Sequence, residues 1–156
     1  MITPIKKDEA YYTNTNQSFA FAGGVVTASY GSATARPHAD TLWTAQDEID
    51  GKGTEGEVAV EGLKTKLIRT VKQQAAGELQ NTDWYVVRKA DANTAIPSAI
   101  TTHRAAVRTK CAEMETAITN AVDTPALETL YTYVNTGTKE NPVMERPLGE
   151  LPTLEV

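Results

Sequence analysis

The stretch Asn81-Thr82-Asp83-Trp84-Tyr85-Val86-Val87-Arg88-Lys89 decides the fold, because it lies between the two longest helical patterns of the sequence. The helix before it is expected to cover about residues 55–79, and the helix after it about residues 98–121. If these two helices pack against each other, the cluster that begins with Trp84 caps or wedges the junction between them. The sequence therefore predicts an antiparallel helical hairpin around this stretch.

The junction stretch itself allows two interpretations. Its run of aromatic and β-branched residues has high β propensity, which favours a strand. Thr82 can instead serve as an N-cap, Asp83 suits the positive end of a helix, and the basic pair that ends the stretch suits the negative end. A strand would need a partner, and the segments on both sides look helical. We therefore expect a short helix over residues 83–90, with a strand as the alternative.

The long helices are predicted from apolar residues that recur at intervals of three or four. Those of the first helix are Val60, Leu63, Leu67, Val71 and Ala75, and those of the second are Ile100, His103, Val107, Cys111, Met114, Ile118 and Ala121. Thr54 and Glu57 have the spacing of a capping box, which would start the first helix. Gly62 and Gly77 each weaken a helix by about 1 kcal/mol relative to alanine, so this helix depends on tertiary packing. A third helix is expected to begin with Thr124 as N-cap and Pro125 as first helical residue, and to run to about residue 134.

A β-hairpin is predicted around Gly23-Gly24, which separates two β-prone runs, residues 18–22 and 25–30. Two glycines supply the positive φ angles that a two-residue hairpin turn needs. This turn pairs Ala22 with Val25 and sets the register of both strands. Directly paired residues share a face, which gathers the apolar side chains of Phe19, Phe21, Val26, Ala28 and Tyr30. A lone hairpin is marginal in water, so this face must cover the helices, another strand or another subunit.

The whole chain is expected to be an α+β protein in three segments. Residues 1–53 form an N-terminal arm, the hairpin and a loop, in which Leu42-Trp43 is either a short strand or an anchor under the loop. Residues 54–137 form a helical domain of two or three helices. Residues 138–156 form an extended tail, since prolines recur in it at five-residue spacing.

Composition and charge exclude some classes of partner. The formal net charge is −5 and the basic residues are scattered, which argues against nucleic-acid binding. No apolar run approaches the roughly 18 residues of a membrane span. The single cysteine, Cys111, cannot form an internal disulfide and is expected to be buried, which is compatible with a reducing cytoplasm.

No catalytic, metal or cofactor site is expected. The sequence has no G-x-S-x-G elbow and no glycine-rich phosphate loop ahead of a helix. His38 is isolated, and Cys111 lies two helical turns after His103, so no pair has metal-ligand spacing. The acidic residues 47–57 resemble a calcium loop, but Gln46 stands where its first aspartate is expected. The chain is therefore interpreted as a non-enzyme that acts through protein contacts.

The residues expected to make those contacts lie in all three segments. They are Phe19, Phe21, Val26, Tyr30, Trp43, Trp84, Tyr85, Arg88, Arg104, Arg108, Leu148, Leu151 and Leu154. Arg104 and Arg108 are four residues apart on a helix, so they can clamp a carboxylate such as Asp83 or one on a partner. The alternative for this pair is a solvated basic strip.

Three short segments resemble a helical module of tailed-bacteriophage tail-fibre assembly or tail assembly chaperone proteins, within about residues 63–134. They are Leu79-Gln80-Asn81-Thr82-Asp83-Trp84-Tyr85-Val86-Val87-Arg88, then Ala95-Ile96-Pro97, then His103-Arg104-Ala105-Ala106-Val107-Arg108. That family has a helix, a Thr-Asp-Trp junction and a second helix that opens with Tyr-Arg-x-x-apolar-Arg. His103 stands where the tyrosine is usual. The resemblance covers somewhat under half of the chain.

The resemblance implies a role in building phage tails. The expected function is a structural or adaptor component of a tail fibre or baseplate, located in the virion tail after assembly in the host cytoplasm. Its partners would be phage tail or fibre proteins and further copies of the same chain, with no nucleic acid and no membrane. The alternative is a dissociating tail-fibre assembly chaperone with the same helical core.

Overall fold

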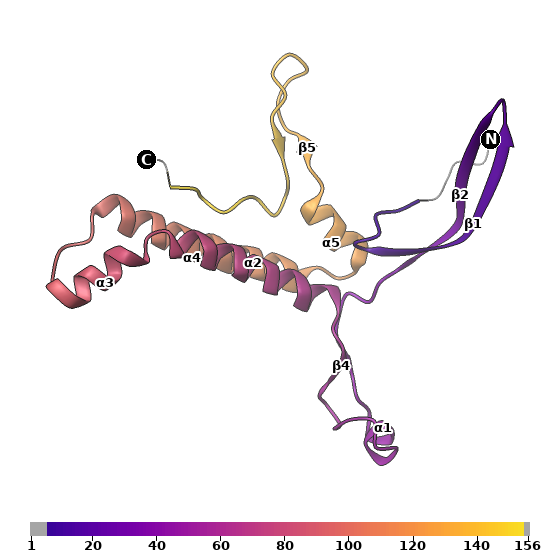
Figure 1. Ribbon diagram of the computed structural model, residues 1–156, viewed down its shortest axis with the longest axis horizontal. Helices are drawn as coiled ribbons and strands as arrows, with labels where there is room; N and C mark the ends of the chain where they lie inside the picture. The colour runs from indigo at the N-terminus through magenta and orange to yellow at the C-terminus, as the bar shows by residue number, and fades with distance from the viewer. Residues whose placement is uncertain (1–5, 155–156) are drawn as a thin grey trace. The chain divides into compact units, whose positions relative to one another are not determined.

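The computed structural model describes residues 6–154 and divides the chain into two compact units. The first unit contains Met1–Leu63 and Val122–Glu128, and the second contains Lys64–Ala121 and Thr129–Val156. Helices and antiparallel strand pairs both occur, so the chain is α+β as predicted (Figure 1). Each unit is built from segments that are distant in the sequence.

The first unit begins with the predicted hairpin, formed by β1 (Tyr12–Ala22) and β2 (Val25–Ala35). The predicted register is confirmed, with Ala22 opposite Val25 and each later pair following from it. Gly23 and Gly24 have φ angles of 58° and 79°, the sign that this two-residue turn requires. The two glycines therefore fix which side chains share a face.

The hairpin is longer than predicted, because residues 12–17 belong to β1 instead of a loose arm. Tyr11 and Tyr12 are buried at its base, and the Tyr12 hydroxyl donates a hydrogen bond to the Glu128 carboxylate at 3.0 Å. Arg36 N donates to Tyr11 O at 2.9 Å and closes the same end of the ladder. These anchors explain why a polar Thr and Asn sequence forms strand here, despite the positive φ angle of 56° at Asn16.

Residues 41–60 form two short strands and a short helix, in a region where a loop and the start of the first long helix were expected. The strands β3 (Thr41–Leu42) and β4 (Val58–Val60) pair antiparallel, and α1 (Ala45–Ile49) lies between them in the chain. The capping box belongs to Thr44 and Asp47, so the predicted start of the long helix at Thr54 is wrong. The helix begins only at Leu63, because Val58–Val60 is used as strand.

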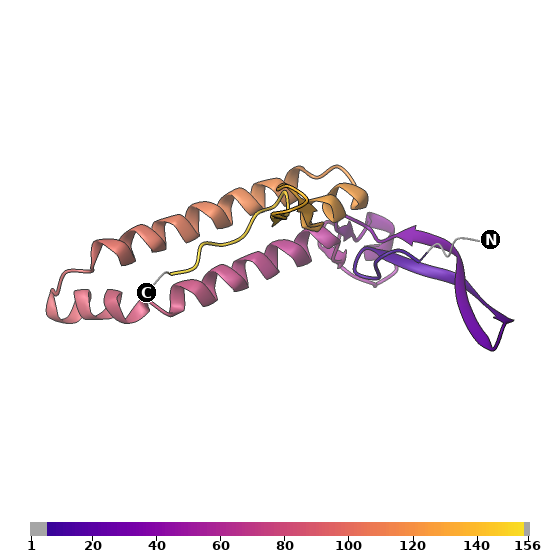
Figure 2. The ribbon, with the colours of Figure 1, turned by 90° about the horizontal axis from the view of Figure 1, so that it is seen from above.

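The second unit contains the predicted helical hairpin, with α2 (Leu63–Gln80) and α3 (Asp83–Ala92) followed by α4 (Ser98–Asn120). Lys64 Nζ donates to Thr119 O at 2.8 Å, and Lys72 pairs with Glu115 at 3.1 Å, which fixes α2 antiparallel to α4 (Figure 2). The buried side chains recur at three- and four-residue intervals. In α2 and α4 they include Val71, Ala75, Ile100, Val107, Met114 and Ile118.

The junction stretch is helical, so the strand alternative is wrong. Thr82 precedes α3, but its side chain does not cap that helix. Its hydroxyl donates instead to Leu79 O at 2.9 Å, at the end of α2. Asn93 ends α3 with a φ of 50°, the left-handed conformation common at helix C-termini.

The last segment comprises α5 (Thr124–Tyr131) and a small hairpin of β5 (Val134–Asn135) with β6 (Met144–Glu145). Asp123 accepts a hydrogen bond from Ala126 N at 2.8 Å, while the Thr124 hydroxyl donates to Arg36 O at 2.6 Å. The predicted N-cap at Thr124 is therefore wrong by one residue.

Candidate interaction surfaces

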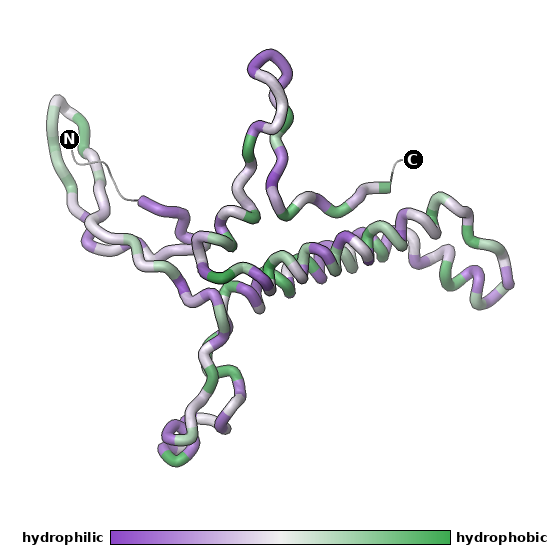
Figure 3. Tube along the Cα trace, turned by 180° about the vertical axis from the view of Figure 1, so that it is seen from behind, coloured by the Kyte–Doolittle hydropathy of each residue, from purple (hydrophilic) through white to green (hydrophobic). Residues whose placement is uncertain are grey.

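The hairpin of β1 and β2, called the ribbon below, has side chains in solvent on both faces. Every residue from Thr15 to Ala28 is exposed. Phe19 and Phe21 are 68% and 75% exposed, and Val26 opposite Phe21 is 64% exposed. Figure 3 shows hydrophobic residues along its strands toward the turn. We define the Phe face as the side chains of Phe19, Phe21, Val26, Ala28 and Tyr30. No described residue covers the part of this face near the turn.

The base of the Phe face is more sheltered than its tip. Tyr30 is half-buried, and its hydroxyl accepts a hydrogen bond from Gln17 at 3.4 Å. The Lys6 ammonium lies 5.8 Å from the centre of the Tyr30 ring. Tyr30 thus holds the base of the Phe face against its own unit, while Phe19 and Phe21 remain exposed.

The opposite face of the ribbon is mainly small and polar. Ser18 and Ser29 share a hydroxyl hydrogen bond of 2.9 Å across the strands. Val25 is an exception on this face, with 61% of its surface exposed. Val25 was not among the residues expected to make protein contacts, because its pairing with Ala22 places it on the face opposite the phenylalanines.

A second apolar surface lies on α3, and it corrects the role expected for Trp84. This side chain is 65% exposed and does not fill the helix junction. Val87, one helical turn later, is also exposed, and the sequence analysis did not select it. Tyr85 and Arg88 are half-buried, with the guanidinium 5.3 Å from the ring centre. Trp84 and Val87 therefore offer an apolar patch on α3, while Tyr85 and Arg88 contact each other.

Arg104 fills the position at the helix junction that was expected for Trp84. Its Nη1 atom lies 2.8 Å from Leu79 O, 2.7 Å from Thr82 Oγ1 and 2.9 Å from Asp83 Oδ1. The predicted pairing of Arg104 with Asp83 is present, but Arg104 is buried and serves its own chain. Arg108 is exposed, and its Nη1 atom reaches only Arg104 O at 3.5 Å. The two arginines thus do not form a joint clamp.

Two other predicted contact groups also face inward. Trp43 is half-buried, and its indole lies so close to Gly53 that a Cβ at that glycine would be 2.3 Å from Nε1. Leu148 is 2% exposed, and its N–H donates to Leu130 O at 3.0 Å. Leu151 and Leu154 are half-buried. Trp43 and Leu148 are therefore structural anchors, not docking residues.

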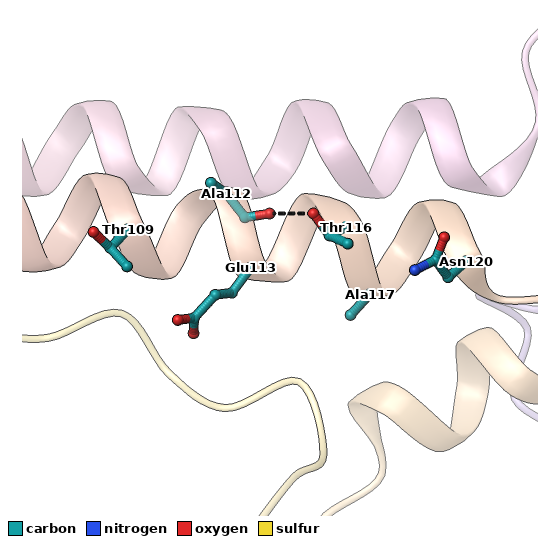
Figure 4. Close-up of a pocket in the computed structure, with 6 residues that line it drawn as sticks. All are labelled: Thr109, Ala112, Glu113, Thr116, Ala117 and Asn120. Carbon is teal, nitrogen blue, oxygen red and sulfur yellow. Dashed lines mark hydrogen bonds between the residues drawn. The ribbon is translucent and has the colours of Figure 1, made fainter.

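An open groove of about 600 Å³ runs along α4, where Figure 4 shows Glu113 as the single carboxylate. The other lining residues are Thr109, Ala112, Thr116, Ala117 and Asn120. The Thr116 hydroxyl donates to Ala112 O at 2.8 Å. No histidine, lysine or cysteine lines the groove, so no base is present there to activate the hydroxyls of Thr109 and Thr116. This groove carries no recognisable reaction chemistry.

Two side chains considered as ligands, His103 and Cys111, belong to no group of three potential metal ligands within residues 6–154. His103 is buried. Cys111 is only half-buried, and its thiol contacts Glu115 at 3.4 Å. Partial burial and this carboxylate raise the pKa of the Cys111 thiol, which lowers its reactivity. Within residues 6–154, no group of three His, Cys, Asp or Glu side chains could hold a metal ion.

The acidic segment that resembles a calcium loop uses its carboxylates internally. Asp47 accepts hydrogen bonds from the Thr44 hydroxyl at 2.7 Å and the Lys52 ammonium at 3.0 Å. Lys52 also pairs with Asp50 at 3.1 Å. The hydrogen bond from Thr44, followed by that from Lys52, lowers the pKa of Asp47 from 3.8 to about 2. These carboxylates thus stabilise the start of α1 and the turn that follows it.

We expect Asp47 to titrate near pH 2 in an NMR titration of its carboxyl carbon, because its charged form accepts these hydrogen bonds. Its folded pKa is depressed, so the stabilising contribution is present above the ordinary value of 3.8 and is lost as pH falls through about 2. Lys52→Met should move the midpoint toward 3.8. A wild-type midpoint at the ordinary value would contradict the capped geometry.

No family profile, curated protein or solved structure matches this chain. Across the described residues, none of the helices combines the length and apolar character needed to cross a membrane. The interaction surfaces are therefore interpreted from their own chemistry.

Proposed function

We propose that this chain is a structural or adaptor subunit of a bacteriophage tail, at the tail fibre or the baseplate, and that it acts by docking to other proteins. The exposed Phe face carries this proposal. Soluble monomers rarely leave contiguous large apolar side chains uncovered, and such patches mark protein contacts. The tail assignment rests on the resemblance of residues 79–108 to the helical module of tail-fibre assembly proteins.

The proposed division of labour follows the burial of the side chains. The α2–α4 pair has a packed interior with Val107 and Ile118 fully buried, so it can serve as a rigid scaffold. The ribbon and the Trp84 patch have little apolar cover and would be the docking elements. The proposed role is non-catalytic and needs no cofactor, and assembly would take place in the host cytoplasm.

The test is mass spectrometry of gradient-purified particles of the phage that encodes the chain. A subunit should be present in a fixed stoichiometry to known tail proteins. Presence only in the infected-cell lysate would overturn the subunit role and favour a dissociating chaperone. Absence from both would remove the tail assignment altogether.

A further inference from the structure

The ribbon lacks the charged residues and prolines that keep strand edges from pairing with other chains, although β1 has an irregularity at Asn16, whose φ angle is 56°. Charged residues make up 22% of the sequence, yet none occurs between Thr13 and Ala35, and no proline occurs there. Natural proteins protect exposed strand edges with lysines, prolines, bulges or covering segments. In the described part of the chain, β1 and β2 pair only with each other, so each has an unpaired outer edge. These edges are open along an uncharged ribbon.

We propose that the ribbon associates with the ribbon of a second copy of this chain, with the two Phe faces packed together. This inference rests on the proposed docking function and names the partner for that surface. Phe19 and Phe21 of each copy would be buried against the other copy. Sheets packed face to face lie about 10 Å apart, so side chains and not strand edges would make this contact.

The absence of charged residues from the ribbon favours a second copy over a partner with a charged surface. Each copy carries a net charge of −5, so contact between identical charged surfaces would place like charges together. Such juxtaposition is strongly unfavourable, whereas an uncharged ribbon meets its copy without that repulsion. A charged partner would find no complementary group between Thr13 and Ala35.

The available area is consistent with a contact that needs the whole face. One buried aromatic side chain contributes about 150–250 Å², whereas a standard interface buries about 800 Å² on each partner. Phe19 and Phe21, which are 68% and 75% exposed, together therefore supply at most about half of the required area. Val26, Ala28 and the surrounding side chains must supply the rest, so a single charge on this face should disrupt the contact.

Val25 and Val26 provide a matched test, because they are adjacent, are 61% and 64% exposed, and lie on opposite faces of the ribbon. The mass of the full chain is measured by size-exclusion chromatography with light scattering over a dilution series. The wild-type chain should exceed its monomer mass of 16.9 kDa. Val26→Lys should raise the dissociation constant at least about 100-fold, because the added charges of two copies would meet. Val25→Lys should leave the constant nearly unchanged.

Disulfide trapping tests the same contact without depending on the stability of a charged variant. In a Cys111→Ser background, Ala28→Cys places a thiol on the Phe face and Thr27→Cys places one on the opposite face. Mild oxidation should give a covalent dimer for Ala28→Cys only. A wild-type chain that stays at 16.9 kDa at every concentration, or equal trapping of both thiols, overturns the proposal.

This outcome is separable from the fate of the proposed function. A monomeric chain that is nevertheless a stoichiometric particle component would refute self-association and leave the docking role intact. A chain that dimerises through Val26 but is absent from particles would support self-association and refute the proposed subunit role.

Discussion

Replacing Arg104 by methionine is expected to lower the free energy of unfolding by about 2–4 kcal/mol, because it removes charge-assisted hydrogen bonds at a buried helix junction. The carbonyl of Leu79 lies in the last turn of α2, where backbone carbonyls have no partner within the helix. It receives hydrogen bonds from Thr82 N at 3.0 Å, from Thr82 Oγ1 at 2.9 Å and from Arg104 Nη1 at 2.8 Å. The positive charge at this end also complements the helix dipole.

A series of variants separates the buried contacts of Arg104 from its ion pair. Asp83→Asn should cost less than about 1 kcal/mol, because the Asp83 side chain is 56% exposed and exposed ion pairs contribute little. Thr82→Val should cost about 1–3 kcal/mol, because the residue is 1% exposed and both of its hydroxyl hydrogen bonds are lost. Arg104→Lys should be intermediate, since it keeps the charge but loses the guanidinium geometry.

Urea denaturation followed by circular dichroism measures each change. A loss as large for Asp83→Asn as for Arg104→Met would show that the ion pair dominates. A negligible loss for Arg104→Met would refute the role of Arg104 at the helix junction.

Local sequence rules predicted the elements that are determined locally. The Gly23-Gly24 turn and the alternation of apolar residues were sufficient for the hairpin and its register. Apolar spacing was sufficient for α2 and α4, whose ends fall within a residue or two of prediction except at the start of α2. The helix at the junction was predicted from the charges at its ends and from Thr82 as N-cap, although the Thr82 side chain does not cap α3.

The failures have a common physical cause, which is pairing over long sequence distances. β1 extends back to Tyr12 because that side chain is anchored by Glu128, 116 residues later. Val58–Val60 is a strand because it pairs with Thr41–Leu42, whereas its own sequence continues the helical spacing of α2. No pattern within a short window contains these partners.

The candidate surface was predictable only in part, for a similar reason. Alternation identified Phe19, Phe21 and Val26, which the structure leaves exposed. Aromatic, basic or aliphatic character also selected Trp43, Arg104 and Leu148, which are held inside their units. Residue type indicates that a side chain can make a strong contact, but only the fold shows whether its own chain already provides the partner.

Gly62 and Gly77 differ sharply in their surroundings, although sequence assigned both to the interior of one helix. Gly62 lies before α2 and is buried, with its N–H donating to Asp40 Oδ1 at 2.7 Å. A Cβ at this position would lie 2.3 Å from the carbonyl carbon of Ala39 and 2.4 Å from its oxygen. Gly77 lies within α2, and a Cβ there would meet nothing within 4 Å.

The same substitution should therefore have opposite effects at the two glycines. Gly62→Ala should lower the free energy of unfolding by about 3 kcal/mol, because two backbone segments must separate to admit the methyl group. Gly77→Ala should raise it by about 0.5–1 kcal/mol, because alanine restricts the unfolded chain and suits a helix interior. Urea denaturation of both variants, followed by circular dichroism, gives the two changes. A stabilising Gly62→Ala would contradict the close approach of Gly62 to Ala39, and a destabilising Gly77→Ala would contradict the open helical site.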